Sequence, residues 1–265
     1  MASEQITPPS GWVDTHLHLL PGIDDGPATM ELALAMAEVI IGDGISHVVV
    51  TPHSNYQFTF DPAQVTVLRD QMQAQLGGRL TLLTGCELHL SFENVQAVLA
   101  NPRLYSLNGG RYVLVEFPEF FERNSMHKAL EGFCEIGLVP VIAHPERNQV
   151  FQQHSSVLDD YLRLGCVAQV TASSFSGRFG KRAQEFSHEL LNRECIHVVA
   201  SDGHSAEQRS PRLSKAHAAI EAAKGAELAR ILCRDNPWAM ACDRKLPYAP
   251  EPAAKRKSLW SRLKG

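Results

Sequence analysis

The chain has 265 residues, of which 44% are hydrophobic and 20% charged, a balance typical of a folded protein rather than a disordered or fibrous one. This length suits either one large α/β barrel or two smaller domains. The formal net charge of -4 provides no broad basic field for a nucleic-acid backbone. Nucleic acid is therefore excluded as an expected partner, whereas a small anionic substrate stays open.

Targeting and thiol motifs are absent from the sequence. Residues 1–11 have neither a basic start nor an apolar stretch, and no window approaches about eighteen consecutive apolar residues, so we expect a cytoplasmic protein. The six cysteines are scattered singly, which predicts buried free thiols rather than disulfides or a zinc-thiolate site. None is followed six positions later by arginine, so the loop of the thiol-based tyrosine phosphatases is missing. The phosphate loop GxxxxGK and the nucleophile motif GxSxG are also missing.

Seven short β-branched or apolar segments are predicted as strands buried on both faces. They cover residues 12–15, 47–51, 80–84, 112–117, 139–143, 167–171 and 197–200. A helical repeat of apolar residues runs from Met30 to Ile41 and ends at Gly42, and Asp61-Pro62 has the form of a helix start. Ser125, Ser156 and Ser210-Pro211 are further predicted helix starts.

The strict alternation of strands and helices predicts a parallel α/β sheet, and seven units without an internal linker favour a closed or nearly closed barrel over two domains. A doubly wound open sheet is the structural alternative. We expect one domain at residues 1–246, followed by a Pro-containing spacer and basic tail at 247–265. The tail surrounds Leu259, Trp260 and Leu263 with basic residues, which suggests contact with an anionic membrane surface or an acidic partner.

Histidines and carboxylates occur at the C-terminal end of nearly every predicted strand. In a barrel these ends form one rim, where active sites of this architecture are built. The histidines of an HxH pair point the same way along a strand and can offer imidazoles to one or two ions together. We therefore expect a metal centre at the C-terminal rim. Its nine candidate ligands are His16, His18, Asp25, His53, Glu87, Glu116, His144, Asp202 and His204.

The types and charges of the candidate ligands limit which metal ions, and how many of them, are expected to bind. Imidazole and carboxylate without thiolate suit Mn, Fe, Zn or Co better than copper or an iron–sulfur cluster. The four carboxylates carry about -4 together, so three divalent ions would leave about +2, or about +1 with a bridging hydroxide, which suits a phosphate dianion. Three ions are therefore predicted. The other histidines are expected to be capping or solvated residues: His47, His89, His127, His154, His188, His197 and His217.

The motifs around these ligands carry a family resemblance. They are His16-x-His18, Pro21-Gly22-Ile23-Asp24-Asp25-Gly26-Pro27, Thr51-Pro52-His53, Gly85-Cys86-Glu87, Glu116-Phe117-Pro118, Ala143-His144-Pro145-Glu146-Arg147 and Ala200-Ser201-Asp202-Gly203-His204. From about residue 12 to residue 240 the sequence resembles the polymerase-and-histidinol-phosphatase (PHP) superfamily, specifically its bacterial capsule and exopolysaccharide tyrosine phosphatases. The resemblance implies a distorted (β/α)7 TIM-like barrel with a trinuclear site and manganese-stimulated hydrolysis of phosphotyrosine. It also implies, as substrate, the tyrosine-rich tail of a membrane-bound autokinase that controls polysaccharide assembly.

The resemblance also implies roles for individual residues. Arg147 and Arg209 would contact the substrate phosphate, for which a planar guanidinium fork is suited. Residues 173–180 also match the family, and their glycines would let the backbone approach a ligand or let the segment move. The implied ligand sets are His16, His18, Glu87 and Asp202 for one ion, Glu87, Glu116 and His144 for a second, and Asp25, His53 and His204 for a third.

Such a site would hydrolyse aryl phosphates by in-line attack of a metal-bridged hydroxide. A tyrosine phenol, with a pKa of about 10, leaves readily without a strong general acid. One alternative is a histidinol phosphatase or other small-molecule phosphoesterase with the same metal motifs. Another is a regulatory module that binds the kinase tail without needing hydrolysis. A polymerase-associated domain is disfavoured because the chain contains no polymerase.

Overall fold

The computed structural model describes residues 8–250, which contain nine strands in two all-parallel sheets. One sheet has the order β1-β2-β4 and the other the order β3-β5-β6-β7-β8-β9. The strands are β1 (Trp12–Leu17), β2 (Ile45–Val50), β3 (His53–Ser54), β4 (Thr81–Thr84), β5 (Glu87–His89), β6 (Tyr112–Glu116), β7 (Val139–Ala143), β8 (Val167–Thr171) and β9 (Val198–Ala200).

Two of the predicted strands, at 47–51 and 80–84, are each followed by a short strand that was not predicted, which divides one ring of strands between two sheets. β2 and β3 are consecutive parts of one extended segment, separated at Pro52, whose missing N–H interrupts the ladder. β4 and β5 are also separated by two residues, Gly85 and Cys86. The Glu87 N–H donates to the carbonyl oxygen of Pro52 at 3.1 Å, so pairing continues across both breaks.

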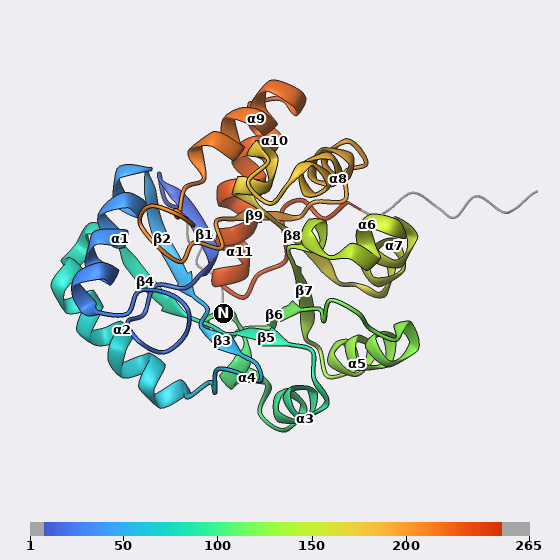
Figure 1. Cartoon of the computed structure of the whole chain (residues 1–265), viewed down its shortest axis with the longest axis horizontal. Coiled ribbons are helices and arrows are strands. Elements are labelled where there is room, and N and C mark those ends of the chain that lie inside the picture. Colours follow the sequence, from blue (N-terminus) through green and yellow to red (C-terminus); the bar gives the residue numbers. More distant parts are fainter. Residues whose placement is uncertain (1–7, 251–265) are drawn as a thin grey trace, which may run out of the picture.

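The ring closes between β1 and the segment that follows β9. Leu17 forms a parallel bridge with Gly203, and the His18 N–H donates to the Gly203 carbonyl at 3.0 Å. The Asp202 N–H donates to the His16 carbonyl at 2.9 Å. With β2–β3 and β4–β5 each counted once, seven strand positions form a closed parallel arrangement inside a shell of helices (Figure 1). The α/β prediction is confirmed, and an open doubly wound sheet would lack this closure.

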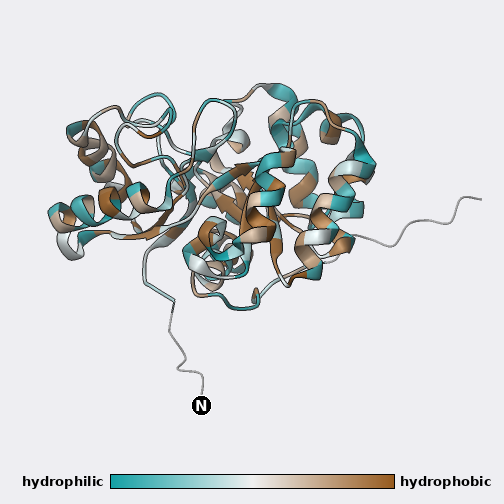
Figure 2. Cartoon of the chain, turned by 90° about the horizontal axis from the view of Figure 1, so that it is seen from below, coloured by the Kyte–Doolittle hydropathy of each residue, from teal (hydrophilic) through white to brown (hydrophobic). Residues whose placement is uncertain are grey.

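The helices from α1 to α8 lie between strands in the chain, whereas α9, α10 and α11 follow the last strand, and α11 appears in the middle of the strand ring in this view (Figure 1). The helices are α1 (Met30–Gly42), α2 (Pro62–Leu76), α3 (Phe92–Ala100), α4 (Pro102–Tyr105), α5 (Arg123–Glu135), α6 (Gln149–Gln153), α7 (Ser155–Leu164), α8 (Lys181–Asn192), α9 (Ser214–Lys224), α10 (Ala226–Arg230) and α11 (Asn236–Ala241). Short 3-10 turns cover Gly77–Arg79, Leu107–Gly109, Pro145–Arg147 and Ala172–Ser176, and a π-helical turn covers Ile231–Asp235. Hydrophobic residues gather on the strands and on the helix faces that cover them (Figure 2).

Helix starts were predicted with mixed success. Asp61 caps α2, where its Oδ1 accepts from the backbone of the next turn, as expected. The prediction of Ser125 as the cap of α5 is wrong, because the carboxylate of Glu122 accepts from the first N–H groups and begins the helix earlier. The prediction for Ser156 is also wrong, since α7 already begins at Ser155 after His154.

The third wrong helix start has a tertiary cause. Ser210 does not begin α9, which starts four residues later at Ser214. The carboxylate of Asp43, at the end of α1, accepts from the N–H groups of Leu213 and Ser214 at 2.6 and 3.0 Å. A residue distant in sequence therefore supplies the cap, which local sequence patterns do not reveal.

Residues just past the predicted domain boundary at residue 246 still contact the folded domain. Asn236 exchanges hydrogen bonds with the backbone of Tyr248, so packing continues two residues past residue 246. The boundary at 246 stays a prediction, and the basic tail lies outside the described residues. Within residues 8–250, no helix combines the length and apolar character needed to cross a membrane.

His197 is buried rather than capping or solvated, which corrects the expectation for this residue. Its side chain accepts from the Ala168 N–H through Nδ1 at 3.2 Å, and burial lowers its pKa to about 4. The unfolded chain binds a proton at His197 below about pH 6.5, whereas the folded chain does so only near pH 4. The free energy of unfolding therefore falls as the pH is lowered from about 6.5 to about 4. The loss between pH 7 and pH 4 amounts to about 3 kcal/mol.

The variant His197→Asn keeps an acceptor near Nδ1 but does not titrate. Between pH 7 and pH 4, we expect its free energy of unfolding to fall by about 3 kcal/mol less than that of the unchanged chain. Urea unfolding at both pH values measures this difference. The same pH dependence in both proteins would contradict the buried neutral state of His197.

Candidate metal centre

All nine side chains predicted as metal ligands lie at the C-terminal rim of the strand ring. His16 lies in β1, His53 in β3 and Glu87 in β5, and the others end a strand or follow one. Each of the nine belongs to at least one group of three or four residues whose ligand atoms lie within 4.8 Å of one another. The four groups are His18, Asp25, His53 and His204; His16, His18 and Glu87; His16, His144 and Asp202; and His53, Glu87 and Glu116.

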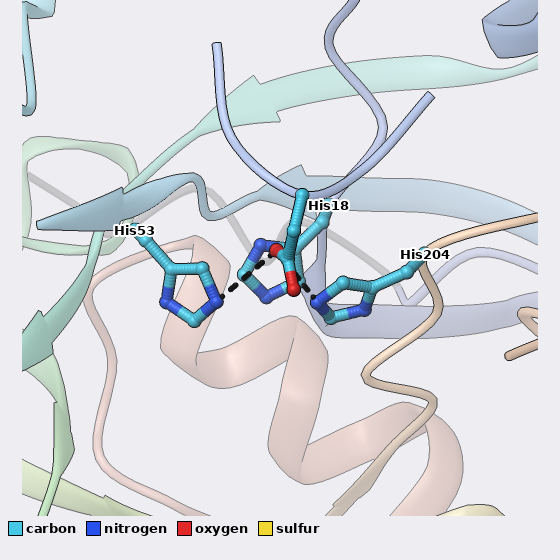
Figure 3. Close-up of side chains that lie close together, drawn as sticks. His18, His53 and His204 are labelled. Atoms are coloured by element: carbon cyan, nitrogen blue, oxygen red, sulfur yellow. Dashed lines mark ion pairs between the residues drawn. The ribbon is translucent and has the colours of Figure 1, made fainter. Parts of the chain in front are cut away.

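The groups overlap, so the nine side chains form one continuous cluster. Four residues each belong to two groups: His16, His18, His53 and Glu87. The groups differ in membership from the three ligand sets implied by the family resemblance. In the outermost group, a carboxylate oxygen of Asp25 lies 3.3 Å from Nε2 of His53 and 3.1 Å from Nε2 of His204 (Figure 3). The structure therefore brings the predicted donors together but does not assign each one to a particular ion.

Glu87 lies at the centre of the cluster. Its Oε2 is 3.2 Å from Nε2 of both His16 and His18, and 3.0 Å from Nδ1 of His53. Its Oε1 is 2.9 Å from Nε2 of His144. Burial alone would raise the pKa of Glu87, but the surrounding imidazoles hold it well below the usual range. A buried carboxylate between four imidazoles is suited to bridging cations.

Outer hydrogen bonds fix the ring orientation of three histidines. In each, Nδ1 faces an oxygen acceptor and therefore donates, which leaves Nε2 of the neutral ring as a lone pair turned into the cluster. These contacts are His16 Nδ1 to Gln169 Oε1 at 2.8 Å, His18 Nδ1 to Asp24 Oδ2 at 2.8 Å, and His204 Nδ1 to the Asp202 carbonyl at 3.0 Å.

The resulting arrangement fits divalent cations. Nε2 of His16 and Nε2 of His18 face each other at 3.3 Å, where two lone pairs repel unless a proton or a cation lies between them. Nε2 of His204 and Oε2 of Glu87 are buried without a hydrogen bond of acceptable geometry. Imidazole and carboxylate groups aimed at common points in this way are the donors that Mn, Fe, Zn or Co accept.

The pKa values of two histidines, His16 and His53, reflect the carboxylates around them. Burial would lower the pKa of His16, but Glu87 and Asp202 raise it to about 9. Burial would also lower the pKa of His53, but Asp25 and Glu87 raise it to about 11. Protons and metal ions compete for these nitrogens, so cation binding is expected to release protons.

Sequence reasoning missed three residues that support the ligands. Asp24 and Gln169 orient His18 and His16, as described above, and His89 Nδ1 lies 3.3 Å from Glu116 Oε2. The expectation of a capping or solvated His89 is therefore wrong. The sequence did contain an indication for Gln169, because a single amide within the buried strand β8 requires a hydrogen-bond partner. Asp24 stands beside the ligand Asp25, and no local pattern separates their roles.

Arg147 and Arg209 meet at a single carboxylate beside the cluster. Both guanidinium groups bind Oδ2 of Asp202, Arg209 at 2.7 Å. Oδ1 of the same carboxylate lies 3.4 Å from Nε2 of His16. Burial raises the pKa of Asp202, but His16 and the two arginines hold it well below its usual range. Two partly exposed arginines therefore adjoin the metal-ligand cluster.

The segment 173–180 supports Arg147 from outside. The Phe179 ring centroid lies 4.3 Å from the guanidinium carbon of Arg147, a cation–π contact. The neighbouring Glu146 is fully buried and accepts from the Ser174 hydroxyl at 2.6 Å and from the Thr171 N–H at 3.0 Å. This segment therefore holds the turn that carries Arg147, an observed role that the sequence left open.

Gly203 allows the two ligand-bearing segments to approach each other. A Cβ at this position would lie 2.8 Å from Pro211 Cα and 2.9 Å from Leu17 Cδ1, both closer than normal contact. We expect Gly203→Ala to lower the free energy of unfolding by about 1–3 kcal/mol and to weaken metal binding. Gly132→Ala is the matched control, because a Cβ there meets nothing within 4 Å. Denaturant unfolding and metal titration of both variants measure the difference, and equal behaviour would contradict this close approach.

The ring of parallel strands and the imidazole–carboxylate cluster together define an α/β barrel with a candidate metal centre at its C-terminal rim. The chain belongs to the family described as "Capsular polysaccharide synthesis, CpsB/CapC", whose model matches residues 12–241. This agrees with the resemblance that the motifs carry.

Individual relatives are similar over nearly the whole chain. The tyrosine-protein phosphatase YwqE of Bacillus subtilis is 32% identical over 249 residues, covering 92% of this chain and 98% of that protein. The tyrosine-protein phosphatase CpsB of Streptococcus pneumoniae is 26% identical over 241 residues, covering 87% and 98%.

Solved structures extend the comparison to the fold. A structure from work on YwqE and CpsB, described as unique metal-dependent tyrosine phosphatases, matches with a TM-score of 0.84 at 32% identity and covers 92% of this chain and all of its own. The histidinol phosphate phosphatase of Lactococcus lactis matches with a TM-score of 0.52 at 14% identity, covering 82% of this chain and 94% of its own, which supports the fold alone.

Proposed function

We propose that this protein is a metal-dependent protein-tyrosine phosphatase. Its substrate would be the phosphotyrosine tail of a membrane-bound bacterial tyrosine autokinase that regulates capsule or exopolysaccharide synthesis. The observation that carries the proposal is the convergence of all nine donors beside two arginines, in a chain whose relatives of similar length are named tyrosine-protein phosphatases.

We propose three divalent ions as cofactors, with manganese the expected ion and Fe, Zn or Co as alternatives. Nine donors in overlapping groups and an excess of carboxylate charge support more than one ion. When bound, such ions would provide an activated water molecule as nucleophile and neutralise the phosphoryl oxygens. Glu87 is the proposed bridging ligand, because both of its oxygens face imidazole nitrogens.

The protein's own side chains would bind and orient the substrate. Arg147 and Arg209 would donate to the phosphoryl oxygens, since both guanidinium groups already lie beside the cluster and remain partly exposed. Asp24 and Gln169 would keep Nε2 of His18 and His16 directed at the ions. The tyrosine phenolate leaves without a strong general acid, so none has to be assigned.

We also propose that the enzyme works in the cytoplasm near the inner face of the membrane, where a membrane-bound kinase would present its tail. The basic segment that would hold it there, within 253–265, lies outside the described residues, so its composition alone supports this part. Deletion of residues 253–265 should reduce sedimentation with anionic liposomes and activity on membrane-embedded kinase. Unchanged sedimentation and activity would refute the membrane role.

The test is phosphate release from a phosphotyrosine peptide, a phosphoserine peptide and histidinol phosphate, each with manganese and with chelator. His144→Ala serves as the blank, because this imidazole contacts Glu87 and its removal should abolish turnover without unfolding the chain. Selective, chelator-sensitive release from phosphotyrosine supports the proposal. Preference for histidinol phosphate would instead favour the small-molecule phosphatase, and absence of turnover on all three would favour the kinase-tail binding module.

A further inference from the structure

A groove runs from the candidate metal centre between the start of α1 and the loop that follows β9. It encloses a volume of about 430 Å³, within the range of small-ligand pockets. At the end nearest the cluster it is lined by Asp25, His204 and Arg209. Farther out its lining includes Pro27 and Leu32. The groove therefore opens directly onto the residues proposed to hold the phosphate and its metal ions.

Both walls of the groove are fixed by local hydrogen bonds. On one side the Gly22 N–H donates to the Pro27 carbonyl at 2.9 Å, which closes the turn that carries Asp25. On the other side the His204 N–H donates to the Arg209 carbonyl at 2.8 Å, and the Ser205 hydroxyl accepts from the Arg209 N–H. A groove with such walls is preformed, so an occupant would pay little ordering cost.

The chemistry of the groove changes along its length. The charged groups belong to or adjoin the metal-ligand cluster, whereas the rest of the lining is mainly apolar. Its apolar residues include Pro27, Ala28, Ala35 and Ala206, and its polar residues are Ser205 and Gln208. Leu32 also lines this part and is 54% exposed, so core packing does not account for it. An occupant with a dianionic head and a flat apolar body matches this order of surfaces.

A second cavity adjoins the cluster at His144 and Arg147 and has a more polar lining. It has about 210 Å³, and Phe117 and Ala143 are its apolar lining residues, each nearly buried. There the Gln149 amide donates to the Glu119 carboxylate at 3.2 Å. Burying an aromatic ring against these polar groups would cost their hydration, and the small exposed surface of Phe117 and Ala143 offers little apolar contact in return. The two cavities therefore differ in the side chain that each can accept.

We propose that the groove beside Leu32 binds the phenyl ring of the substrate phosphotyrosine, with the phosphate at the metal-ligand cluster next to Arg209. This inference rests on the proposed function and adds the residues that distinguish an aryl phosphate from a short alkyl phosphate. Leu32 is the specificity-determining side chain, because it presents the largest exposed apolar surface in the groove.

The experiment compares Leu32→Asn with the conservative Leu32→Met. Val67→Asn is the matched control, because Val67 is 53% exposed on α2 and does not line the groove. Three quantities are measured with manganese: kcat/KM for phenyl phosphate, kcat/KM for a phosphotyrosine peptide, and the inhibition constant of inorganic phosphate. Leu32→Asn should lower both kcat/KM values about tenfold and leave the inhibition constant unchanged, since the substitution adds no charge and the inhibitor has no ring. Leu32→Met and Val67→Asn should match the unchanged chain.

Two results would overturn the groove assignment. One is a Leu32→Asn variant with unaltered kcat/KM on phenyl phosphate, and the other is a change in phosphate inhibition as large as the change in kcat/KM. Failure of the proposed function looks different, because the unchanged chain with manganese would then release no phosphate from the phosphotyrosine peptide.

Discussion

Replacement of Glu87 by glutamine is expected to abolish metal binding and to reduce phosphate release from a phosphotyrosine peptide by more than about a thousandfold. Glutamine has nearly the same shape, but it removes the negative charge that faces four imidazole nitrogens. A neutral amide also presents N–H donors on one side, which cannot coordinate a cation. The substitution therefore acts on the ions directly and leaves the strand ring in place.

Metal content by mass spectrometry and turnover with added manganese measure this effect, and circular dichroism checks the fold. Glu93→Gln is the control, because it makes the same substitution at an exposed position in the first turn of α3. A Glu87→Gln protein that retains bound metal and activity within about tenfold of the unchanged chain would remove Glu87 from the proposed centre.

Replacement of Arg147 by methionine is expected to lower kcat/KM for the phosphotyrosine peptide about a hundredfold while metal content stays the same. Methionine keeps an apolar stem beneath the Phe179 ring but removes the charged donors. Asp202 would retain its contact with Arg209 at 2.7 Å, so the carboxylate is not left unpaired. The loss should therefore reflect phosphate binding rather than collapse of the metal-ligand cluster.

Arg178→Met provides the comparison for this variant, since Arg178 is an exposed arginine in the segment that contacts Arg147. Arg147→Lys should fall between the unchanged chain and Arg147→Met, because an ammonium keeps the charge but not the planar fork. Equal activities of Arg147→Met and Arg178→Met would contradict a phosphate-binding role for Arg147.

The rim of metal donors followed from the sequence because parallel strands place their C-terminal ends at one edge. Runs of buried β-branched residues located the strands, and β7 and β8 have the predicted bounds. The position of each histidine or carboxylate at a strand end then predicted convergence without knowledge of any distance. This reasoning brought all nine proposed donors to one rim, but it could not separate Asp25 from its neighbour Asp24.

Side-chain partners that come from elsewhere in the chain were not predictable in the same way. Gln169 orients His16 across 153 residues of sequence, and Asp43 caps a helix 170 residues away. His197 and His89 looked like ordinary histidines, but one is buried against Ala168 and the other contacts Glu116. Tertiary contacts decide such roles, and a single sequence has no local pattern that records them.

The most direct test of the metal centre is a titration of manganese into chelator-treated protein, with bound metal and phosphate release from a phosphotyrosine peptide measured on the same samples. The proposed centre predicts about three equivalents of bound ion and activity that rises with occupancy, as expected for ions that act in the reaction. Phosphate release that is unaffected by the chelator, or a protein that binds no manganese at the concentrations that support turnover, would contradict it.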